Sequence, residues 1–83
     1  MAQSQTIIKG KISENKTNEA IPFVNVTILG TSQGVQSDVN GNFTITVKEY
    51  GSGKVQFSSV GYRNEIKSFK KDVTQTISIR LTS

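Results

Sequence analysis

Few side chains in this sequence have the chemistry of an active site. The 83 residues include no His and no Cys, which removes the usual general base, the thiolate nucleophile and the commonest metal ligands. A serine activated by a lysine is the nucleophilic arrangement that remains, and Lys54 with Ser58 or Ser59 is the candidate. Alternation of period two places Lys54 and Ser58 on the outward face of a predicted strand, as in an ordinary solvated face. We predict that the chain is not an enzyme.

The segment from Asp38 to Asn42 carries oxygen-bearing side chains at alternating positions, as a calcium-binding loop does. Asp38, Asn40 and Asn42 are the candidate ligands. The next acidic residue is Glu49, so no carboxylate follows closely enough to complete the coordination shell. A tight turn explains the same residues, because Asn-Gly favours a positive φ and the Asp38 side chain is able to accept backbone amides. We therefore predict a capped turn, with no metal and no cofactor.

The charged residues give a weak indication of the partner. Lys and Arg number 10 against 6 Asp and Glu, for a net charge of +4, and the charges are scattered along the chain. Nucleic-acid binding needs cations interleaved with exposed aromatic residues, and Lys67, Phe69 and Lys71 come nearest to that pattern. Lysines on an edge strand also protect a sheet against aggregation, and we prefer this interpretation. We predict no nucleic-acid partner.

The elements that must position these residues are predicted to be strands. Nine Ile and eight Val stand against two Leu and two Ala, and β-branched side chains favour a pleated sheet. Alternating apolar and polar residues mark strands at 6–13, 23–28, 35–37, 43–48, 54–60, 63–69 and 77–81. Residues 6–83 are thus predicted to form one all-β domain, a β-sandwich of about seven strands. Residues 1–5 are predicted to be a disordered leader or a remnant of expression, and they are not a signal peptide.

Two sets of residues follow from this division into strands. Gly30, Gly34, Gly41 and Gly61, together with Asp38, are predicted to shape turns. In the strand at 63–69, Ile66 and Phe69 are out of phase with each other, which predicts a bulge or an edge strand. Ile66, Lys67 and Phe69 are therefore the candidate surface for a partner that adds a strand to the sheet.

With its strands and turns placed, the chain resembles the carboxypeptidase regulatory-like domain, a transthyretin-like β-sandwich with Greek-key connections. The matching motifs run through residues 7–81, and they are Gly10 to Ile12, Pro22 to Ile28, Gly30 to Gly34, Ser37 to Phe43 and Phe57 to Tyr62. Ser37 stands where the family most often has Thr, and Phe23 stands where a Gly often follows the proline. The resemblance implies a structural role for the motif residues, with Phe43 and Phe57 in the core.

The resemblance also implies a biological context. In gram-negative bacteria such domains often form the N-terminal periplasmic extension of TonB-dependent outer-membrane nutrient transporters. We therefore expect a location in the periplasm at the outer membrane, with the signal peptide missing from this sequence. The expected partner is the rest of a longer chain, or a periplasmic or outer-membrane protein. Two alternatives stay open, namely an accessory domain of a metallocarboxypeptidase and a free-standing secreted module that binds a surface.

Overall fold

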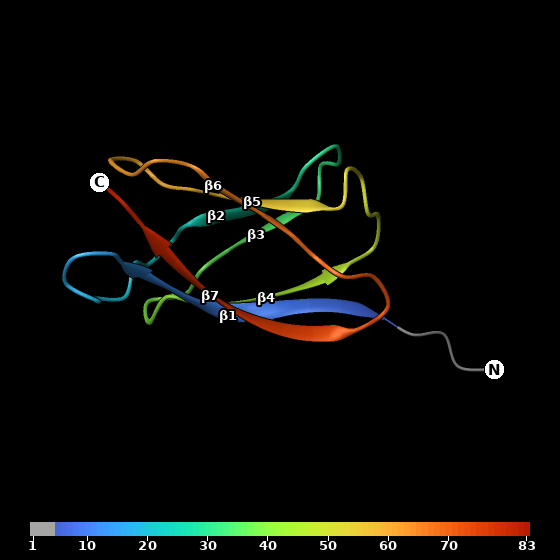
Figure 1. Cartoon of the computed structure of the whole chain (residues 1–83), viewed down its shortest axis with the longest axis horizontal. Helices are drawn as coiled ribbons and strands as arrows, with labels where there is room; N and C mark the ends of the chain where they lie inside the picture. Colours follow the sequence, from blue (N-terminus) through green and yellow to red (C-terminus); the bar gives the residue numbers. More distant parts are fainter. Residues whose placement is uncertain (1–4) are drawn as a thin grey trace.

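The computed structural model describes residues 5–83, which form two β-sheets packed face to face (Figure 1). The strands are β1 (Thr6–Glu14), β2 (Asn25–Ile28), β3 (Gly34–Gln36), β4 (Asn42–Val47), β5 (Lys54–Ser58), β6 (Glu65–Ser68) and β7 (Thr74–Leu81). The described chain has no helix that is long and apolar enough to cross a membrane. The predicted all-β sandwich of seven strands is confirmed. Apart from Gln5, the predicted leader at residues 1–5 lies outside the described residues.

The two sheets differ in size and in strand direction. One has three strands in the order β4-β1-β7, and the other has four in the order β3-β2-β5-β6. β1 pairs with β4 antiparallel and with β7 in parallel, whereas every pair in the four-stranded sheet is antiparallel. The chain passes from one sheet to the other after β1, β3, β4 and β6. Figure 1 shows that β1 begins at one end of the sandwich and that the C-terminus lies at the other.

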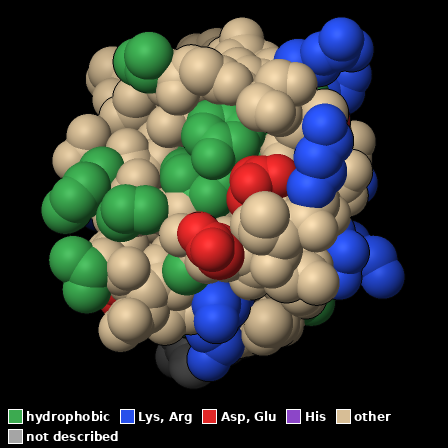
Figure 2. All heavy atoms as spheres, turned by 90° about the vertical axis from the view of Figure 1, so that its left-hand side faces the viewer, with side chains coloured by type: hydrophobic (Ala, Val, Ile, Leu, Met, Phe, Trp, Pro, Cys, Tyr) green, Lys and Arg blue, Asp and Glu red, His purple; other side chains and the backbone are tan. Residues whose placement is uncertain are grey.

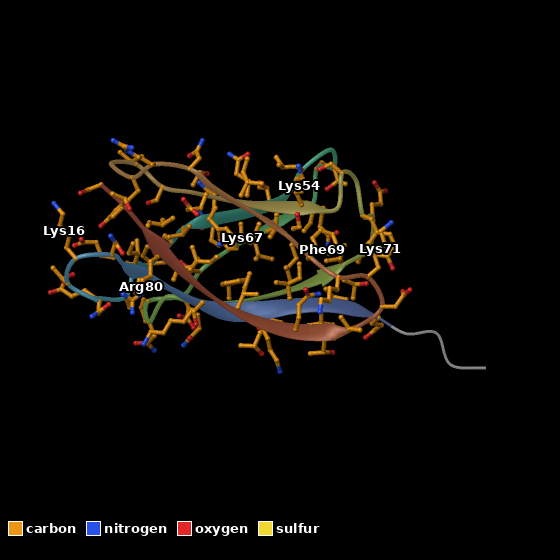
Figure 3. All side chains as sticks on the ribbon, viewed as in Figure 1. Lys16, Lys54, Lys67, Phe69, Lys71 and Arg80 are labelled. Atoms are coloured by element: carbon orange, nitrogen blue, oxygen red, sulfur yellow. The ribbon has the colours of Figure 1, made fainter. Side chains whose placement is uncertain are left out.

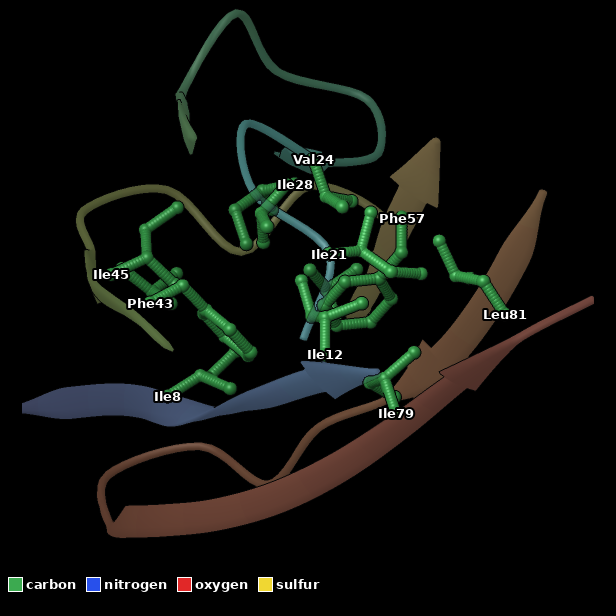
Figure 4. Close-up of a cluster of buried hydrophobic side chains, with 13 residues drawn as sticks. Ile8, Ile12, Ile21, Val24, Ile28, Phe43, Ile45, Phe57, Ile79 and Leu81 are labelled. Carbon is green, nitrogen blue, oxygen red and sulfur yellow. The ribbon is translucent and has the colours of Figure 1, made fainter. Parts of the chain in front are cut away.

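The core forms where the inward residues of the two sheets meet. Along β4, every second residue from Phe43 to Val47 is buried and the residues between them are exposed, as alternation of period two requires. The buried hydrophobic side chains pack into one cluster (Figure 4), made up of Ile8, Ile12, Ile21, Val24, Val26, Ile28, Phe43, Ile45, Val47, Val55, Phe57, Ile79 and Leu81. The rings of Phe43 and Phe57 pack edge to face with centroids 5.4 Å apart, and this contact joins the two sheets.

The strand predicted from Phe23 begins two residues later, at Asn25. Phe23 lies in a turn with a φ of 59°, in the left-handed region that favours glycine, and its side chain is 60% exposed. The buried hydroxyl of Ser37 holds this turn, because it accepts the N–H of Val24 at 2.8 Å and donates to the carbonyl of Ile21 at 3.0 Å. The predicted strand at 35–37 accordingly ends at Gln36, before this buried serine.

The last three strands also differ from the predicted bounds. β5 ends at Ser58, and Val60 is fully exposed in the turn that follows. β6 is an edge strand of four residues, and this edge position agrees with its broken alternation. β7 begins at Thr74 instead of Ile77, because pairing with β1 extends it over polar residues. The result is a long strand at the edge of the three-stranded sheet.

Candidate functional site

The residues considered for nucleophilic catalysis lie apart in the structure. Lys54 and Ser58 are the first and last residues of β5, so their Cα atoms are about 13 Å apart at the usual rise of a strand. Ser59 lies in the turn after this strand, where its carbonyl accepts the N–H of Tyr62 at 3.1 Å. Over residues 5–83, no three Cys, His, Asp or Glu side chains come together in a group able to hold a metal ion. The separation along β5 therefore keeps Lys54 and Ser58 from acting as a base and its nucleophile.

Asp38 uses its carboxylate within its own turn. The Oδ1 atom accepts the N–H groups of Asn40 and Asn42, each at 2.9 Å, and the Asp38 N–H donates to the Asn42 carbonyl at 2.9 Å. Gly41 has a φ of +78°, and a Cβ atom there would lie 2.5 Å from the carbonyl oxygen of Ile12. A side chain at Gly41 is therefore excluded both by conformation and by space. The geometry is that of a capped turn that rests against β1.

The other glycines singled out from the sequence have two different roles. Gly30 and Gly61 lie in turns, with φ values of 84° and 88°. Gly34 is instead the first residue of β3, where a Cβ atom would come within 2.9 Å of the Val26 carbonyl oxygen. Its small size therefore allows β3 to approach β2 closely, which is a packing role and not a turn.

The structure does not bring Ile66, Lys67 and Phe69 together on one exposed surface. Ile66 is 51% exposed and Lys67 is exposed, both on β6. Phe69 follows the strand, is half-buried against the core, and places its ring 6.3 Å from that of Tyr50. The Lys71 ammonium lies 4.9 Å from the centre of the same Tyr50 ring, and Figure 3 shows Phe69 and Lys71 near one end of the sandwich. Ile66, Lys67 and Phe69, the candidate surface for an added strand, are thus not one exposed binding face.

The reason for the broken alternation is that β6 turns its charged residues inward. Lys67 is opposite the buried Val55 and Glu65 is opposite the buried Phe57, so both charged side chains lie on the face that looks toward the other sheet. Lys67 is labelled in Figure 3. Ile66, which is opposite Gln56, lies on the outward face. Inward charges on an edge strand oppose the addition of a further strand, because pairing would bury them.

A polar network that sequence analysis missed closes the end of the sandwich at which β1 begins. Thr6 is 2% exposed, and its hydroxyl donates to the Tyr50 hydroxyl at 3.2 Å. The Tyr50 hydroxyl donates to Asp72 Oδ1 at 2.9 Å. The backbone N–H of Asp72 donates in turn to Thr6 Oγ1 at 2.6 Å. These three residues are far apart in the sequence, and they tie the β6–β7 turn to β1.

The two long sides of the sandwich, where the edge strands of the sheets lie, are built differently. We call the side on which β3 contacts β4 the Gln33 side. There the Gln33 carboxamide donates to the Thr46 carbonyl and accepts the Lys48 N–H at 2.9 Å. We call the opposite side, between β6 and β7, the β7 side. One connection there is the Arg63 N–H donating to the Thr82 carbonyl at 2.8 Å. The other is the Gln75 carboxamide, which bonds the N–H and carbonyl of Lys70 at 2.9 and 2.7 Å.

Apolar side chains project from three turns at the end of the sandwich opposite the start of β1. Phe23, Val39 and Val60 are 60%, 69% and 100% exposed. Asn25 pairs with both Gln36 and Ser58, so the turn before Asn25 lies beside the turns that follow Gln36 and Ser58. Figure 2 looks at this end and shows hydrophobic side chains mainly on one side and Lys and Arg side chains mainly on the other.

Comparison with known proteins gives one family and two structural neighbours. The family model of the CarboxypepD_reg-like domain matches residues 8–83. No curated protein matches the chain. A chain from the type II cohesin-X-dockerin complex of Acetivibrio cellulolyticus is similar in structure, with a TM-score of 0.70 and 17% identity, over 92% of this chain and 56% of that one.

The second neighbour is a putative membrane-associated protein of unknown function from Bacteroides fragilis. It has a TM-score of 0.70 and 21% identity, over 100% of this chain and 29% of that chain. The present chain thus spans little more than half of the first neighbour and less than a third of the second. At these identities the likeness shows a shared fold.

Proposed function

The chain belongs to the CarboxypepD_reg-like domain family, and from that premise we propose that it is an accessory domain that acts through contacts with other proteins. Domains of this family are regulatory β-sandwich domains without a catalytic role. The observation that carries the proposal is the extent of the match, which covers residues 8–83 and includes six strands completely and most of β1. The matched domain therefore accounts for nearly all of the chain.

We propose further that the domain is the N-terminal periplasmic extension of a TonB-dependent outer-membrane nutrient transporter. Domains of this family often hold that position. Both structural neighbours are longer chains, and one of them is a putative membrane-associated protein. The opposite placement of the start of β1 and the C-terminus suits a domain that stands in series with others (Figure 1).

Strand addition at a sheet edge is the mode of contact that the architecture favours. A sandwich has edge strands with unpaired backbone groups, and an extended partner segment is able to pair with them. The β7 side offers such edges, whereas the Gln33 carboxamide occupies the edge of β4 on the other side. One of the structural neighbours comes from a protein–protein complex, which supports a role in protein contact.

Cell fractionation tests the proposed context. An antibody raised against this domain is used to blot the cytoplasmic, periplasmic and outer-membrane fractions of the source cells, with a marker protein for each fraction. We expect a band far larger than 9.1 kDa in the outer-membrane fraction. A small soluble band would contradict the proposal and favour a free-standing secreted module. A large soluble band that carries carboxypeptidase activity would favour an accessory domain of that enzyme.

A further inference from the structure

The outer edge of β7 has backbone groups that point away from the sheet. The bonds from Ile7 N–H to the Val73 carbonyl, at 3.1 Å, and from Asn15 N–H to the Leu81 carbonyl, at 2.9 Å, fix the pattern of the parallel β1–β7 ladder. In a parallel ladder every second residue bonds the neighbouring strand. The odd-numbered residues 73–81 therefore bond β1, and the even-numbered residues direct their N–H and carbonyl groups outward.

The position of Thr82 agrees with this alternation. Its carbonyl accepts the Arg63 N–H from outside the sheet at 2.8 Å, as an outward-directed group should. At the other end of the strand, the Gln75 side chain bonds the Lys70 backbone. Between these two connections, Thr76, Ser78 and Arg80 present outward backbone groups, and all three residues are exposed. This stretch has the length of an ordinary short strand.

The outer face beside this edge is basic. Thr76 lies in register with Lys9 and Ser78 with Lys11, and these pairs lie on the outward face because Ile8 and Ile12 of β1 point inward. The small Thr76 and Ser78 side chains leave the lysines accessible from the edge. The residues with outward side chains on the three strands include no Asp or Glu, and they are Ile7, Lys9, Lys11, Ser13, Asn42, Thr44, Thr46, Thr74, Thr76, Ser78 and Arg80.

A shallow groove crosses the same face. It has a volume of about 380 Å³, and the residues that line it include Lys9, Gly10, Lys11, Thr76 and Ser78. On the inward side of the edge, Ile77 and Phe69 are half-buried. A strand added to β7 would therefore meet cations on its outer face and apolar side chains on its inner face.

The other free edge of the β7 side, β6, is less suited to strand addition. Lys67 and Glu65 point inward there, opposite buried residues of β5, and a new strand would bury both charges. On β7 the inward residues between the two connections are Ile77 and Ile79, which carry no charge. The backbone groups and the side chains thus favour β7.

We propose that the β7 edge from Thr76 to Arg80 is the docking site for an extended, acidic segment of a partner protein. This inference rests on the proposed role in protein contact and names the edge and the partner's chemistry. The segment adds to the three-stranded sheet as a fourth strand, beyond β7. The partner segment has acidic residues at alternate positions, and their side chains lie on the outer face of the sheet, level with Thr76, Ser78 and Arg80. There they face Lys9, Lys11 and Arg80. The residues between them are apolar and cover Ile77 and Phe69.

A synthetic peptide of ten residues in which Glu alternates with Val is the first probe. The ¹⁵N-labelled chain is titrated with it, and amide exchange is measured by NMR. We expect the outward amides of Thr76, Ser78 and Arg80 to become protected on binding. A matched peptide with Lys in place of Glu should bind roughly tenfold more weakly or worse, because its charges repel those of the face.

Two proline variants distinguish the edges. S78P removes an outward N–H of β7 without removing a β1–β7 bond. S68P is its counterpart on β6. The Phe69 N–H donates to the Gly53 carbonyl at 3.1 Å, so by alternation the N–H of the preceding Ser68 points outward. S78P should lower the affinity at least about tenfold, whereas S68P should leave it unchanged. A peptide N-methylated on the edge that faces β7 tests the same bonds in the unmodified protein, in case S78P disturbs the fold.

Each other outcome overturns the proposal. Protection of Ile66 and Ser68, with binding lost in S68P, would assign docking to β6. Equal binding of the Glu and Lys peptides would contradict the proposal that the partner is acidic. If neither peptide binds, the proposed docking site itself is contradicted. Protection of the β7 amides without peptide, rising with protein concentration, would make a second copy of the chain the occupant. All these results are obtained on the isolated chain, so they are distinguishable from failure of the cell-fractionation test.

Discussion

The Gln33 side and the β7 side differ in how they treat the unpaired backbone groups at the edge of a sheet. On the Gln33 side, one carboxamide bonds the Thr46 carbonyl and the Lys48 N–H, so that a side chain takes the place of a further strand. On the β7 side, the Gln75 carboxamide bonds the Lys70 backbone at one end of the edge strand, and the outward groups from Thr76 to Arg80 are left to the solvent.

The difference shows how a small sandwich is able to cover the backbone groups of one edge and leave those of another exposed. An uncovered edge is a risk of aggregation, and proteins usually cover it or place charges on it. Here the β4 edge is covered and β6 carries inward charges. Between its two end connections β7 has no inward charge, and its one charged residue, Arg80, lies on the outward face. We interpret the β7 edge as a surface kept open for a partner.

The largest expected effect on stability comes from Gly10→Ala, which acts on the pairing of β1 with β7. β1 has β4 on one side and β7 on the other, but the three atoms nearest to a Cβ at Gly10 all belong to Ile77 of β7, the carbonyl oxygen at 1.8 Å. The side chain would force β7 away from β1. We expect a loss of about 3 kcal/mol in the free energy of unfolding, measured by urea denaturation.

Amide exchange in Gly10→Ala should rise first along β7, and β4 should keep its protection. Gly61→Ala is the matched control, because a Cβ at Gly61 meets no atom within 4 Å and the cost comes from its φ of +88° alone. That control should lose about 1 kcal/mol. Equal losses in the two variants would mean that the close approach of β1 and β7 is not what constrains Gly10.

Gln33→Ala acts on the opposite side, with a smaller effect. It removes the bonds to the Thr46 carbonyl and the Lys48 N–H, which then turn to solvent. We expect a loss of about 1–2 kcal/mol in the free energy of unfolding, together with faster exchange of the Lys48 amide.

Gln36→Ala is the control for this substitution, because the Gln36 side chain bonds the Asn25 side chain at 3.1 Å and no backbone group. It should leave the Lys48 amide protected. If Gln33→Ala leaves that amide protected as well, then the carboxamide is not what closes this side.

Tyr50→Phe tests the polar network that ties the β6–β7 turn to β1. The substitution keeps the ring next to Phe69 and Lys71 but removes the hydroxyl between Thr6 and Asp72. We expect a loss of about 1 kcal/mol in the free energy of unfolding, with faster exchange in the turn at 70–73. An unchanged turn would show that the Asp72 N–H bond to Thr6 at 2.6 Å is sufficient by itself.

Much of the fold follows from local sequence. Alternation of period two in β4 predicts its three buried residues, and the Asp-Val-Asn-Gly sequence predicts the turn before it. Where the alternation fails, a tertiary contact is the cause. The strand predicted from Phe23 starts only at Asn25, because the turn held by the buried Ser37 places Phe23 at a φ of 59°.

The candidate site is less predictable, because an edge is a property of the whole topology. Nothing local to Thr74–Leu81 indicates that the strand runs parallel to β1 with its other side free. Gln33 and Gln75 look like ordinary polar residues until their backbone partners are known, which lie 13 and 15 residues from Gln33 and 5 residues from Gln75. The broken alternation at Ile66 did indicate an edge strand, but the candidate residues Ile66, Lys67 and Phe69 do not form one exposed surface, because Ile66 faces outward, Lys67 faces inward and Phe69 is half-buried.

The smallest expected effect on stability comes from Lys67→Val on β6, and it would remove the difference between the two edges of the β7 side. Lys67 is exposed, so the free energy of unfolding should change by less than about 1 kcal/mol. The substitution replaces an inward charge opposite Val55 with an apolar residue beside the half-exposed Ile66. β6 should then accept a strand, and we expect the chain to self-associate in sedimentation velocity at high concentration.

Lys54→Val is the control that distinguishes the effect of a free strand edge from the effect of replacing a charged residue with valine. Lys54 is also an exposed lysine in the four-stranded sheet, but it lies on β5, which has β2 and β6 as neighbours and no free edge. Both variants lose one positive charge and gain one exposed valine. If Lys67→Val associates and Lys54→Val stays monomeric, the inward charge protects the β6 edge. If both associate equally, exposed apolar surface is the cause, and the argument for β7 over β6 then depends on the outward backbone groups of β7 alone.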